Sequence, residues 1–185
     1  GRIGLAMPRS EMGQGVHTAL AMLAAEELSV PLSMIDLMPV IGDAIYGNVA
    51  MQLGSLPIHP RHETDAPDTP VAARMGRWFV AKLARELGLQ VTGGSTSVAD
   101  AWDVVRLAAA SARASLVAAA ARRWQAPEDA LQLRDGAILH TDGRRIGYGE
   151  IAHDAVLQPV RHPQPKPPSG WTLIGQPLPR IDSAS

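Results

Sequence analysis

The sequence contains no cysteine among its 185 residues. A chain without thiols forms no disulfide, has no thiolate nucleophile, and cannot hold zinc or an iron–sulfur cluster through cysteine.

Aromatic residues are also scarce, and neither sign of charge is in large excess. Phe, Trp and Tyr make up 4% of the chain, which disfavours modules that bind nucleic acid by stacking bases on aromatic rings. Seventeen Lys and Arg residues against 18 Asp and Glu residues give a formal net charge of −1. This whole-chain charge predicts no general attraction to DNA or to an anionic membrane. Hydrophobic residues amount to 46%, which is enough for a folded core.

Long uninterrupted apolar runs are missing as well. The most apolar stretch, Val104–Ala121, contains Arg106, Arg113 and two serines, so we expect it not to span a bilayer. No positively charged leader precedes an apolar segment, so no signal peptide is recognised. The chain starts at Gly1 without an initiator methionine, and we expect a processed chain or an excised fragment.

The spacing of apolar residues predicts a mixture of strands and helices. We expect strands at 3–7 and 35–40, helices at 16–28, 71–87, 98–124 and 148–157, and a hairpin around Asp135-Gly136. Gly88 is expected just past the end of one helix, and Ser97 with Asp100 is expected to form a capping box at the start of the next. The order of these elements predicts an α/β (α+β) fold, a two-layer mixed sheet with packed helices.

Two proline-containing stretches show neither helical nor strand periodicity of apolar residues. Residues 42–70 are expected to form an irregular insertion in a domain that spans residues 1–158; segments of this kind are usually functional or partner-binding. Residues 159–185 are predicted to be a Pro-rich linker towards a further, missing domain. Within that linker, Trp171, Leu173 and Ile174 could dock on a surface.

Two segments place small residues immediately before a helix. Gly13-Gln14-Gly15 precedes one helix, and Gly93-Gly94-Ser95-Thr96-Ser97 precedes another. Free N–H groups at a helix start can hold an anion or a pterin oxygen, and the hydroxyls add donors. The alternative for both segments is ordinary helix capping. Neither is a nucleotide motif, because the first lacks the third glycine of a dinucleotide fingerprint and the second lacks the Gly-Lys-Ser/Thr of a P-loop.

The other polar residues give weaker indications of function. The Gln14 amide offers both a donor and an acceptor, which suits the edge of a heterocycle, or it is an exposed turn residue. His59 and His62 with Glu63 suggest a metal cluster, but the flanking prolines prevent the required register, so we expect no metal site. Glu26 and Glu27 are expected on a solvated helix face. No nucleophile–base triad is recognised, and no catalytic residue is assigned.

These segments carry a family resemblance. The sequence Glu11-Met12-Gly13-Gln14-Gly15, within residues 8–20, resembles a motif of the molybdopterin-binding subunits in the xanthine dehydrogenase/aldehyde oxidase family. Residues 87–102, which include Thr92-Gly93-Gly94-Ser95-Thr96-Ser97, resemble a second block of the same subunits. Residues 173–182 resemble the segment that leads into the next domain.

The resemblance implies the N-terminal part of the large subunit of a bacterial molybdenum hydroxylase. Such enzymes oxidise an N-heterocycle or an aldehyde with water-derived oxygen. The implied cofactor is molybdopterin cytosine dinucleotide, and the implied partners are a small iron–sulfur subunit and the remainder of the large subunit. Residues 1–158 would form a molybdopterin-binding subdomain. Compartment stays open between cytoplasm and periplasm.

Carried over residue by residue, the resemblance assigns roles at two loops. Gln14 would hydrogen-bond the pterin, with Gly13 and Gly15 permitting close approach of the backbone. Cofactor phosphate would be held at the second loop, by Gly94, Ser95, Thr96 and Ser97. The cofactor itself would carry the oxygen-transfer chemistry.

The chain also departs from the family pattern. The Gly-Glu motif with the catalytic glutamate and the Gly-rich segment near the metal are absent, so we expect the fragment alone to be inactive and to self-associate. Two alternatives stay open. One is a non-catalytic remnant or interaction domain without cofactor, and the other is a generic phosphate- or nucleotide-binding module.

Overall fold

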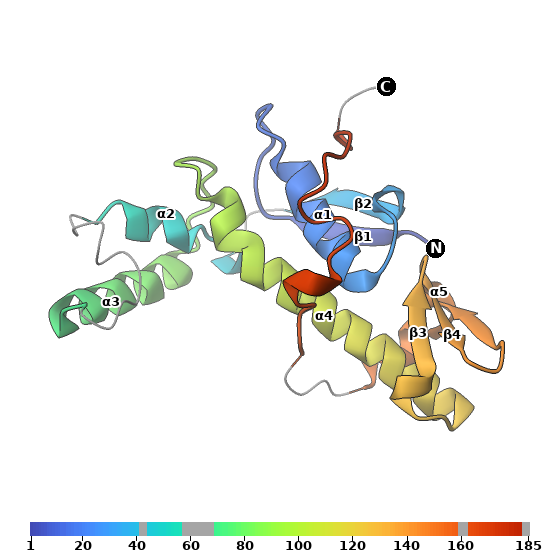
Figure 1. Ribbon diagram of the computed structural model, residues 1–185. Coiled ribbons are helices and arrows are strands. Elements are labelled where there is room, and N and C mark those ends of the chain that lie inside the picture. The colour runs from blue at the N-terminus through green and yellow to red at the C-terminus, as the bar shows by residue number, and fades with distance from the viewer. Residues whose placement is uncertain (41–43, 57–68, 159–162, 183–185) are drawn as a thin grey trace. The chain divides into compact units, whose positions relative to one another are not determined.

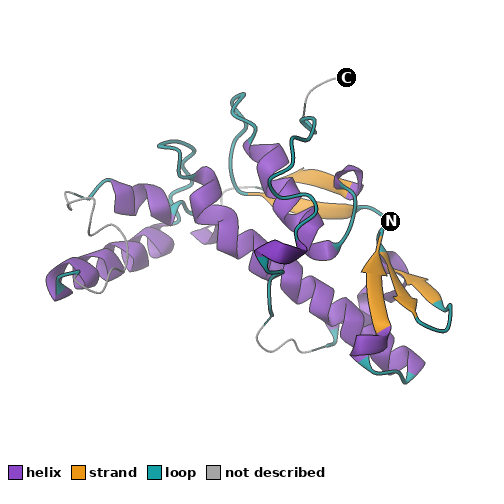
Figure 2. Ribbon diagram, viewed as in Figure 1, coloured by secondary structure: helices purple, strands orange, loops and turns teal. Residues whose placement is uncertain are grey.

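The computed structural model describes residues 1–40, 44–56, 69–158 and 163–182. The chain divides into two units, and each is described by itself. Unit 1 comprises residues 1–5, 17–38 and 102–185, and unit 2 comprises residues 6–16 and 39–101. Helices and small sheets occur together (Figure 2), so the predicted α+β class is confirmed.

The predicted helices and strands are present, and two elements are added to them (Figure 1). The helices are α1 (Val16–Leu28), α2 (Val49–Gly54), α3 (Val71–Leu87), α4 (Ser97–Trp124) and α5 (Tyr148–Val156). The strands are β1 (Ile3–Met7), β2 (Ile35–Pro39), β3 (Leu131–Arg134), β4 (Ala137–His140) and β5 (Arg145–Gly147). Helix α2 and strand β5 have no counterpart among the predicted elements.

The strands form two small sheets instead of one mixed sheet. β1 pairs with β2, and β3, β4 and β5 form an antiparallel sheet in that order. The predicted hairpin joins β3 to β4: Asp135 and Gly136 have φ angles of 48° and 73°. Two positive φ angles in succession are the signature of a type I′ turn, whose twist matches that of the strands.

The expectation of an irregular segment over residues 42–70 is wrong for residues 49–54, which form α2. Asn48 supplies the local signal for this helix, because its side-chain oxygen accepts the N–H of Met51 at 3.0 Å and thereby caps the first turn. Helix α2 packs against α3 in unit 2, and the two lie side by side in Figure 1.

Unit 1 is built around small and branched apolar side chains. Alanine at close-packed positions lets neighbouring elements approach. Its most deeply buried apolar residues include Leu20, Ala21, Ala25, Ala110, Ala120, Ala137, Ile138 and Ile151. The Tyr148 hydroxyl donates to the Leu28 carbonyl at 2.7 Å, and burial raises the pKa of this phenol.

By length and composition alone, α4 could cross a membrane. Its arginines indicate instead a helix that packs along one face against the rest of unit 1. Arg106 and Arg113 both reach Glu27 of α1, and Leu116 is buried on the same helix. Guanidinium groups that pair with a buried carboxylate stabilise the packing of this helix within a folded unit.

The expectation that Glu26 and Glu27 form a solvated helix face is wrong. They are 1% and 0% exposed. The carboxylate of Glu27 accepts from Arg106 Nε at 2.9 Å and from Arg113 Nη1 at 2.6 Å. Helix α1 is apolar on nearly every side, so most of the helix is buried and its two acids are buried with it. They are tolerated there because cationic partners and N–H donors satisfy them.

Glu26 binds the C-terminal segment, residues 163–182. Its carboxylate accepts the backbone N–H groups of Thr172 and Leu173, both at 2.6 Å, and the ammonium of Lys166 at 3.1 Å. Burial on its own would raise the pKa of Glu26, but these N–H donors and the Lys166 charge outweigh burial and hold the pKa below its ordinary value.

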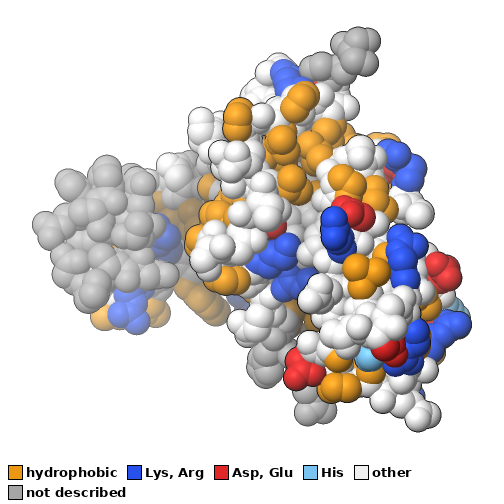
Figure 3. Space-filling model, turned by 45° about the vertical axis from the view of Figure 1, so that its right-hand side comes forward, with side chains coloured by type: hydrophobic (Ala, Val, Ile, Leu, Met, Phe, Trp, Pro, Cys, Tyr) orange, Lys and Arg blue, Asp and Glu red, His pale blue; other side chains and the backbone are white. Residues whose placement is uncertain are grey.

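The predicted docking of Trp171 is confirmed. Its ring stands edge-on to Trp102 of α4 at 5.9 Å between centroids. The guanidinium of Arg106 lies 5.3 Å from the centroid of each of the two rings. On the face of the molecule shown in Figure 3, basic, acidic and hydrophobic side chains are interspersed, as the net charge of −1 leads one to expect.

Candidate functional site

The first predicted segment forms a tight loop, residues 8–15, that leads into α1. Gly13 and Gly15 have φ angles of +98° and +83°, which glycine adopts without a steric cost. The N–H groups of both residues donate to one carboxylate oxygen of Glu11, at 2.9 and 2.8 Å. Two backbone N–H groups of this loop therefore converge on one carboxylate oxygen of the same loop.

Gln14 closes this loop. Its Nε2 donates to the Ser10 carbonyl at 2.9 Å, and its Oε1 accepts the Met12 N–H at 2.5 Å. These bonds fit the turn-residue alternative. An amide has a second N–H and a second lone pair, and the side chain is exposed. Gln14 therefore retains the capacity to contact a ligand while it holds the loop.

The second predicted segment is the loop that precedes α4. Gly94 and Ser95 are exposed and have φ angles of +58° and +56°. Thr96 is committed to the fold, because its hydroxyl accepts from Asn48 Nδ2 at 2.8 Å and donates to the Gly93 carbonyl at 2.9 Å. Within the described part of the chain, the hydroxyls of Ser95 and Ser97 form no hydrogen bond. They and the first N–H groups of α4 are the donors that a ligand could use.

The two loops are in contact within unit 2. The Ser10 N–H donates to Thr92 Oγ1 at 2.9 Å, across 82 positions of sequence. The structure thus brings together the loop that carries Gly13, Gln14 and Gly15 and the loop that carries Gly94 to Ser97.

A buried ion pair fixes this arrangement. The guanidinium of Arg9 pairs with the carboxylate of Asp100 in the first turn of α4, and their side chains are 2% and 14% exposed. Arg9 also donates to the Tyr46 carbonyl at 2.6 Å, and Asp100 accepts the Ala50 N–H at 2.8 Å. Asp100 is occupied by these partners and Ser97 already lies inside the helix, so the predicted Ser97–Asp100 capping box is wrong.

Asn48 is a second buried residue that anchors this arrangement, and the sequence did not predict its role. It is 1% exposed, and its amide donates to the Val91 carbonyl at 2.9 Å as well as to Thr96. Its signal was the capping preference of asparagine, obscured because the surrounding segment was expected to be irregular. Arg9 was missed because a single arginine beside a proline belongs to no sequence pattern that predicts a buried ion pair. His59, His62 and Glu63 lie outside the described residues.

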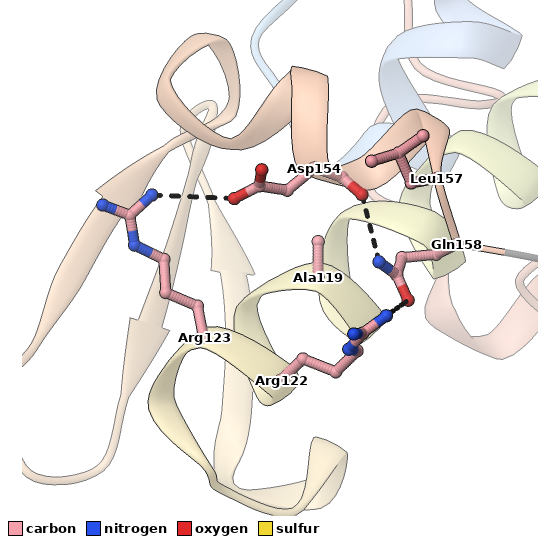
Figure 4. Close-up of a pocket in the computed structure, with 6 residues that line it drawn as sticks. All are labelled: Ala119, Arg122, Arg123, Asp154, Leu157 and Gln158. Carbon is pink, nitrogen blue, oxygen red and sulfur yellow. Dashed lines mark hydrogen bonds and ion pairs between the residues drawn. The ribbon is translucent and has the colours of Figure 1, made fainter.

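A separate pocket of about 370 Å³ occurs in unit 1, between the end of α4 and α5 (Figure 4). None of the predicted cofactor residues lines it. Its polar groups pair with one another: Arg122 donates to Gln158 at 3.2 Å, Gln158 donates to the Asp154 carbonyl at 3.1 Å, and Arg123 lies 3.8 Å from the Asp154 carboxylate. Because these polar groups are engaged with one another, the pocket does not indicate a catalytic site.

Comparison with known proteins gives two relatives and no match to a family model. The chain is 33% identical over 153 residues to isoquinoline 1-oxidoreductase subunit beta from Brevundimonas diminuta, which covers 82% of this chain and 15% of that subunit. It is 28% identical over 181 residues to a membrane-bound aldehyde dehydrogenase (pyrroloquinoline-quinone) from Gluconacetobacter polyoxogenes, which covers 95% of this chain and 18% of that protein.

Both relatives are named as oxidoreductases, and the chain spans less than a fifth of the length of either. The first is a subunit of a larger enzyme by its name. The resemblance carried by the two loops is confirmed by these matches: the chain is related to the molybdopterin-binding subunits of the xanthine dehydrogenase/aldehyde oxidase family.

Proposed function

We propose that this chain forms one wall of the cofactor cleft in the large subunit of a molybdenum hydroxylase. The parent enzyme would oxidise an N-heterocycle or an aldehyde with water-derived oxygen. The observation that carries this proposal is the contact between the two glycine-containing loops through Ser10 and Thr92. Two loops that are joined by a hydrogen bond can hold two parts of a single ligand, which separate helix caps would not do.

The donor set fits an anionic, heterocyclic cofactor. The pair of N–H groups at Gly13 and Gly15 already accommodates a carboxylate oxygen, that of Glu11, so its geometry suits an anion. A cofactor oxygen placed there would displace the Glu11 side chain. At the other loop, the unengaged hydroxyls of Ser95 and Ser97 stand at the start of a 28-residue helix, where negative charge is favoured.

In this proposal each residue has a binding role. Gln14 contacts the pterin, Gly13 and Gly15 let the backbone approach it, and Gly94, Ser95 and Ser97 hold phosphate. Thr96 acts indirectly by fixing the loop to Asn48. The molybdopterin cytosine dinucleotide would supply the oxygen-transfer chemistry. The chain's residues would bind and orient it.

The proposal also requires partners. A chain with no cysteine cannot carry the iron–sulfur clusters that would remove electrons, so these would belong to a small partner subunit. The base for the reaction and the substrate contacts would come from the remainder of the large subunit. The division into a cofactor-binding part, residues 1–158, and a linker, residues 159–185, stays a prediction.

The test is a titration of the isotopically labelled chain followed by amide NMR shifts. Pyrophosphate and cytidine diphosphate are the probes for the phosphate end, and pyrroloquinoline quinone is the probe for the cofactor named in one relative. We expect saturable shifts of the amides of residues 94–97 with the phosphate probes and of Gly13 and Gly15 with pyrroloquinoline quinone. Ser97→Ala should weaken binding by about tenfold, as loss of a hydrogen bond to a charged group does. Ser55→Ala, an exposed serine of the same unit, is the matched control.

Glu11→Ala tests the first loop. Removal of the resident carboxylate should strengthen binding of pyrroloquinoline quinone, the heterocyclic probe, at Gly13 and Gly15, because the ligand no longer competes with Glu11. Binding of pyrophosphate with no preference for the cytidine compound would favour a generic phosphate module. No shifts at either loop with any probe would favour a non-catalytic remnant and would contradict the proposal.

A further inference from the structure

Helix α3 carries an exposed apolar ridge. Val71, Met75, Phe79, Leu83 and Leu87 follow one another at every fourth position, and all five are exposed. Residues four apart are neighbours on a helix surface and are offset by about 40° around its axis, so these side chains form a continuous row that winds around part of the helix from Val71 to Leu87. Trp78 lies beside the row, and Met75, Trp78 and Phe79 are 66%, 64% and 61% exposed.

The opposite side of α3 belongs to the fold. Ala84 is 5% exposed, and α3 packs against α2 in the same unit. The ridge is therefore not the face that stabilises unit 2. An exposed apolar surface of this extent usually marks a site of interaction with a partner or a membrane.

The ridge has a mainly cationic border on one side, where the row Arg74, Trp78, Lys82 and Glu86 runs beside it. Helix α3 contains four basic residues, Arg74, Arg77, Lys82 and Arg85, against the single acid Glu86, a balance of +3. The ammonium of Lys82 lies 5.5 Å from the centroid of the Trp78 ring. The net charge of −1 is a sum over the whole chain and hides this local excess of positive charge.

The charge and shape of this face select among possible occupants. A second copy of α3 would bring its own Arg74, Lys82 and Arg85 against these, and like charges oppose such a pairing. A protein partner would need an acidic-rimmed groove shaped for a convex ridge. A fluid anionic bilayer surface receives apolar side chains at the acyl boundary and cationic side chains among its headgroups, without a preformed groove.

We propose that α3 is an interfacial helix that lies in the headgroup region of an anionic membrane, with the ridge inserted and Arg74, Lys82 and Arg85 among the headgroups. The helix does not span the bilayer, because it has 17 residues and five of them are charged. This inference goes beyond the proposed cofactor function and does not depend on it.

The test is co-sedimentation of the chain with vesicles of phosphatidylglycerol and phosphatidylcholine, compared with vesicles of phosphatidylcholine alone. We expect binding to the anionic vesicles, weaker binding in 0.5 M NaCl, and little binding to the neutral ones. The variant Trp78→Ser/Phe79→Ser should weaken binding by about tenfold or more. Lys82→Glu/Arg85→Glu should weaken it to a similar extent and remove the salt dependence.

The matched control is Val156→Ser/Leu157→Ser at the end of α5, where two exposed apolar residues are replaced outside α3. It should bind as the unchanged chain does, and circular dichroism should show that all variants are folded. Equal binding to neutral vesicles, or binding unaffected by the α3 variants, would overturn the proposal. So would concentration-dependent association without lipid that the Trp78→Ser/Phe79→Ser variant abolishes, since the ridge would then be a protein interface.

Discussion

At the scale of single residues, Glu11 and Gln14 show how one loop can have two uses. Glu11 satisfies the N–H groups of Gly13 and Gly15, and Gln14 bonds to Ser10 and Met12. These bonds shape the loop when no ligand is bound. The same N–H groups become available if the Glu11 side chain rotates away. The loop therefore combines ordinary turn chemistry with the capacity to hold an anion.

The conformation of Gly15 leads to a first prediction about stability. An added Cβ would meet no atom within 4 Å at Gly15, so Gly15→Ala would be opposed only by its φ of +83°. We expect a loss of about 1–2 kcal/mol in the free energy of unfolding. Gly149→Ala in α5 is the control, because it also has open space and has no positive φ. It should stabilise the chain by about 0.5–1 kcal/mol. Urea unfolding measures both, and equal effects would contradict the role of φ.

At the scale of elements, α1 shows why a pair of neighbouring acids need not be solvated. Glu27 is neutralised by Arg106 and Arg113 of α4, and Glu26 is satisfied largely by the C-terminal segment. The backbone N–H of Lys166 also donates to Glu27, so both acids hold the C-terminal segment, and Glu27 in addition joins α1 to α4. A helix that is buried nearly all round can carry charge only where such partners are supplied.

The lowered pKa of Glu26 leads to a prediction about acid. Because its pKa is lower in the folded chain than in the unfolded chain, its contribution to stability is complete above about pH 4.3, the ordinary glutamate value, and is lost as the pH falls through the folded value. Glu26→Gln should therefore be less stable than the unchanged chain at pH 7, and the difference should shrink on acidification below about pH 4.3.

Unfolding by urea at a series of pH values measures this difference. Glu128→Gln, at an exposed position of the same unit, is the matched control and should change little. A difference between Glu26→Gln and the unchanged chain that stayed constant from pH 7 to pH 3.5 would show that the Glu26 charge has no part in holding the C-terminal segment.

At the scale of the whole molecule, the chain consists of two units with separate networks of buried charge. Arg9 and Asp100 belong to unit 2, and Glu27, Arg106 and Arg113 belong to unit 1. The loops proposed to hold the cofactor rest on the first network, and the C-terminal segment rests on the second. Proteins open in cooperative parts that often follow such divisions.

Hydrogen exchange tests this division. Asp100→Ala leaves the buried Arg9 guanidinium without its carboxylate and should cost about 3–5 kcal/mol, with faster exchange mainly in unit 2. Glu27→Ala should have a cost of the same order, with faster exchange mainly in unit 1. Arg2→Ala, which removes an exposed ion pair with Asp36, should change little. Mass spectrometry of peptides locates the effect, and a uniform acceleration in both units would contradict the separation.

Local features of the fold could be predicted from the sequence because their causes are local. Each of these signals spans only a few residues of the element that it specifies. Examples are the apolar spacing of the helices at 16–28 and 71–87 and the turn at Asp135-Gly136. The two glycine-containing loops were also recognisable, and with them the family. Helix α2 was missed although its cap at Asn48 is local, because the prolines around it suggested an irregular segment.

The sequence by itself therefore determined the helices, the hairpin and the family, since periodicity and turn chemistry act over short spans. Only the tertiary structure decided that Ser10 meets Thr92, that Arg9 pairs with Asp100 and that Glu26 and Glu27 are buried. The physical reason is that each of these depends on groups far apart in sequence. Whether a charged side chain is solvated or buried is fixed by the partners that folding brings to it.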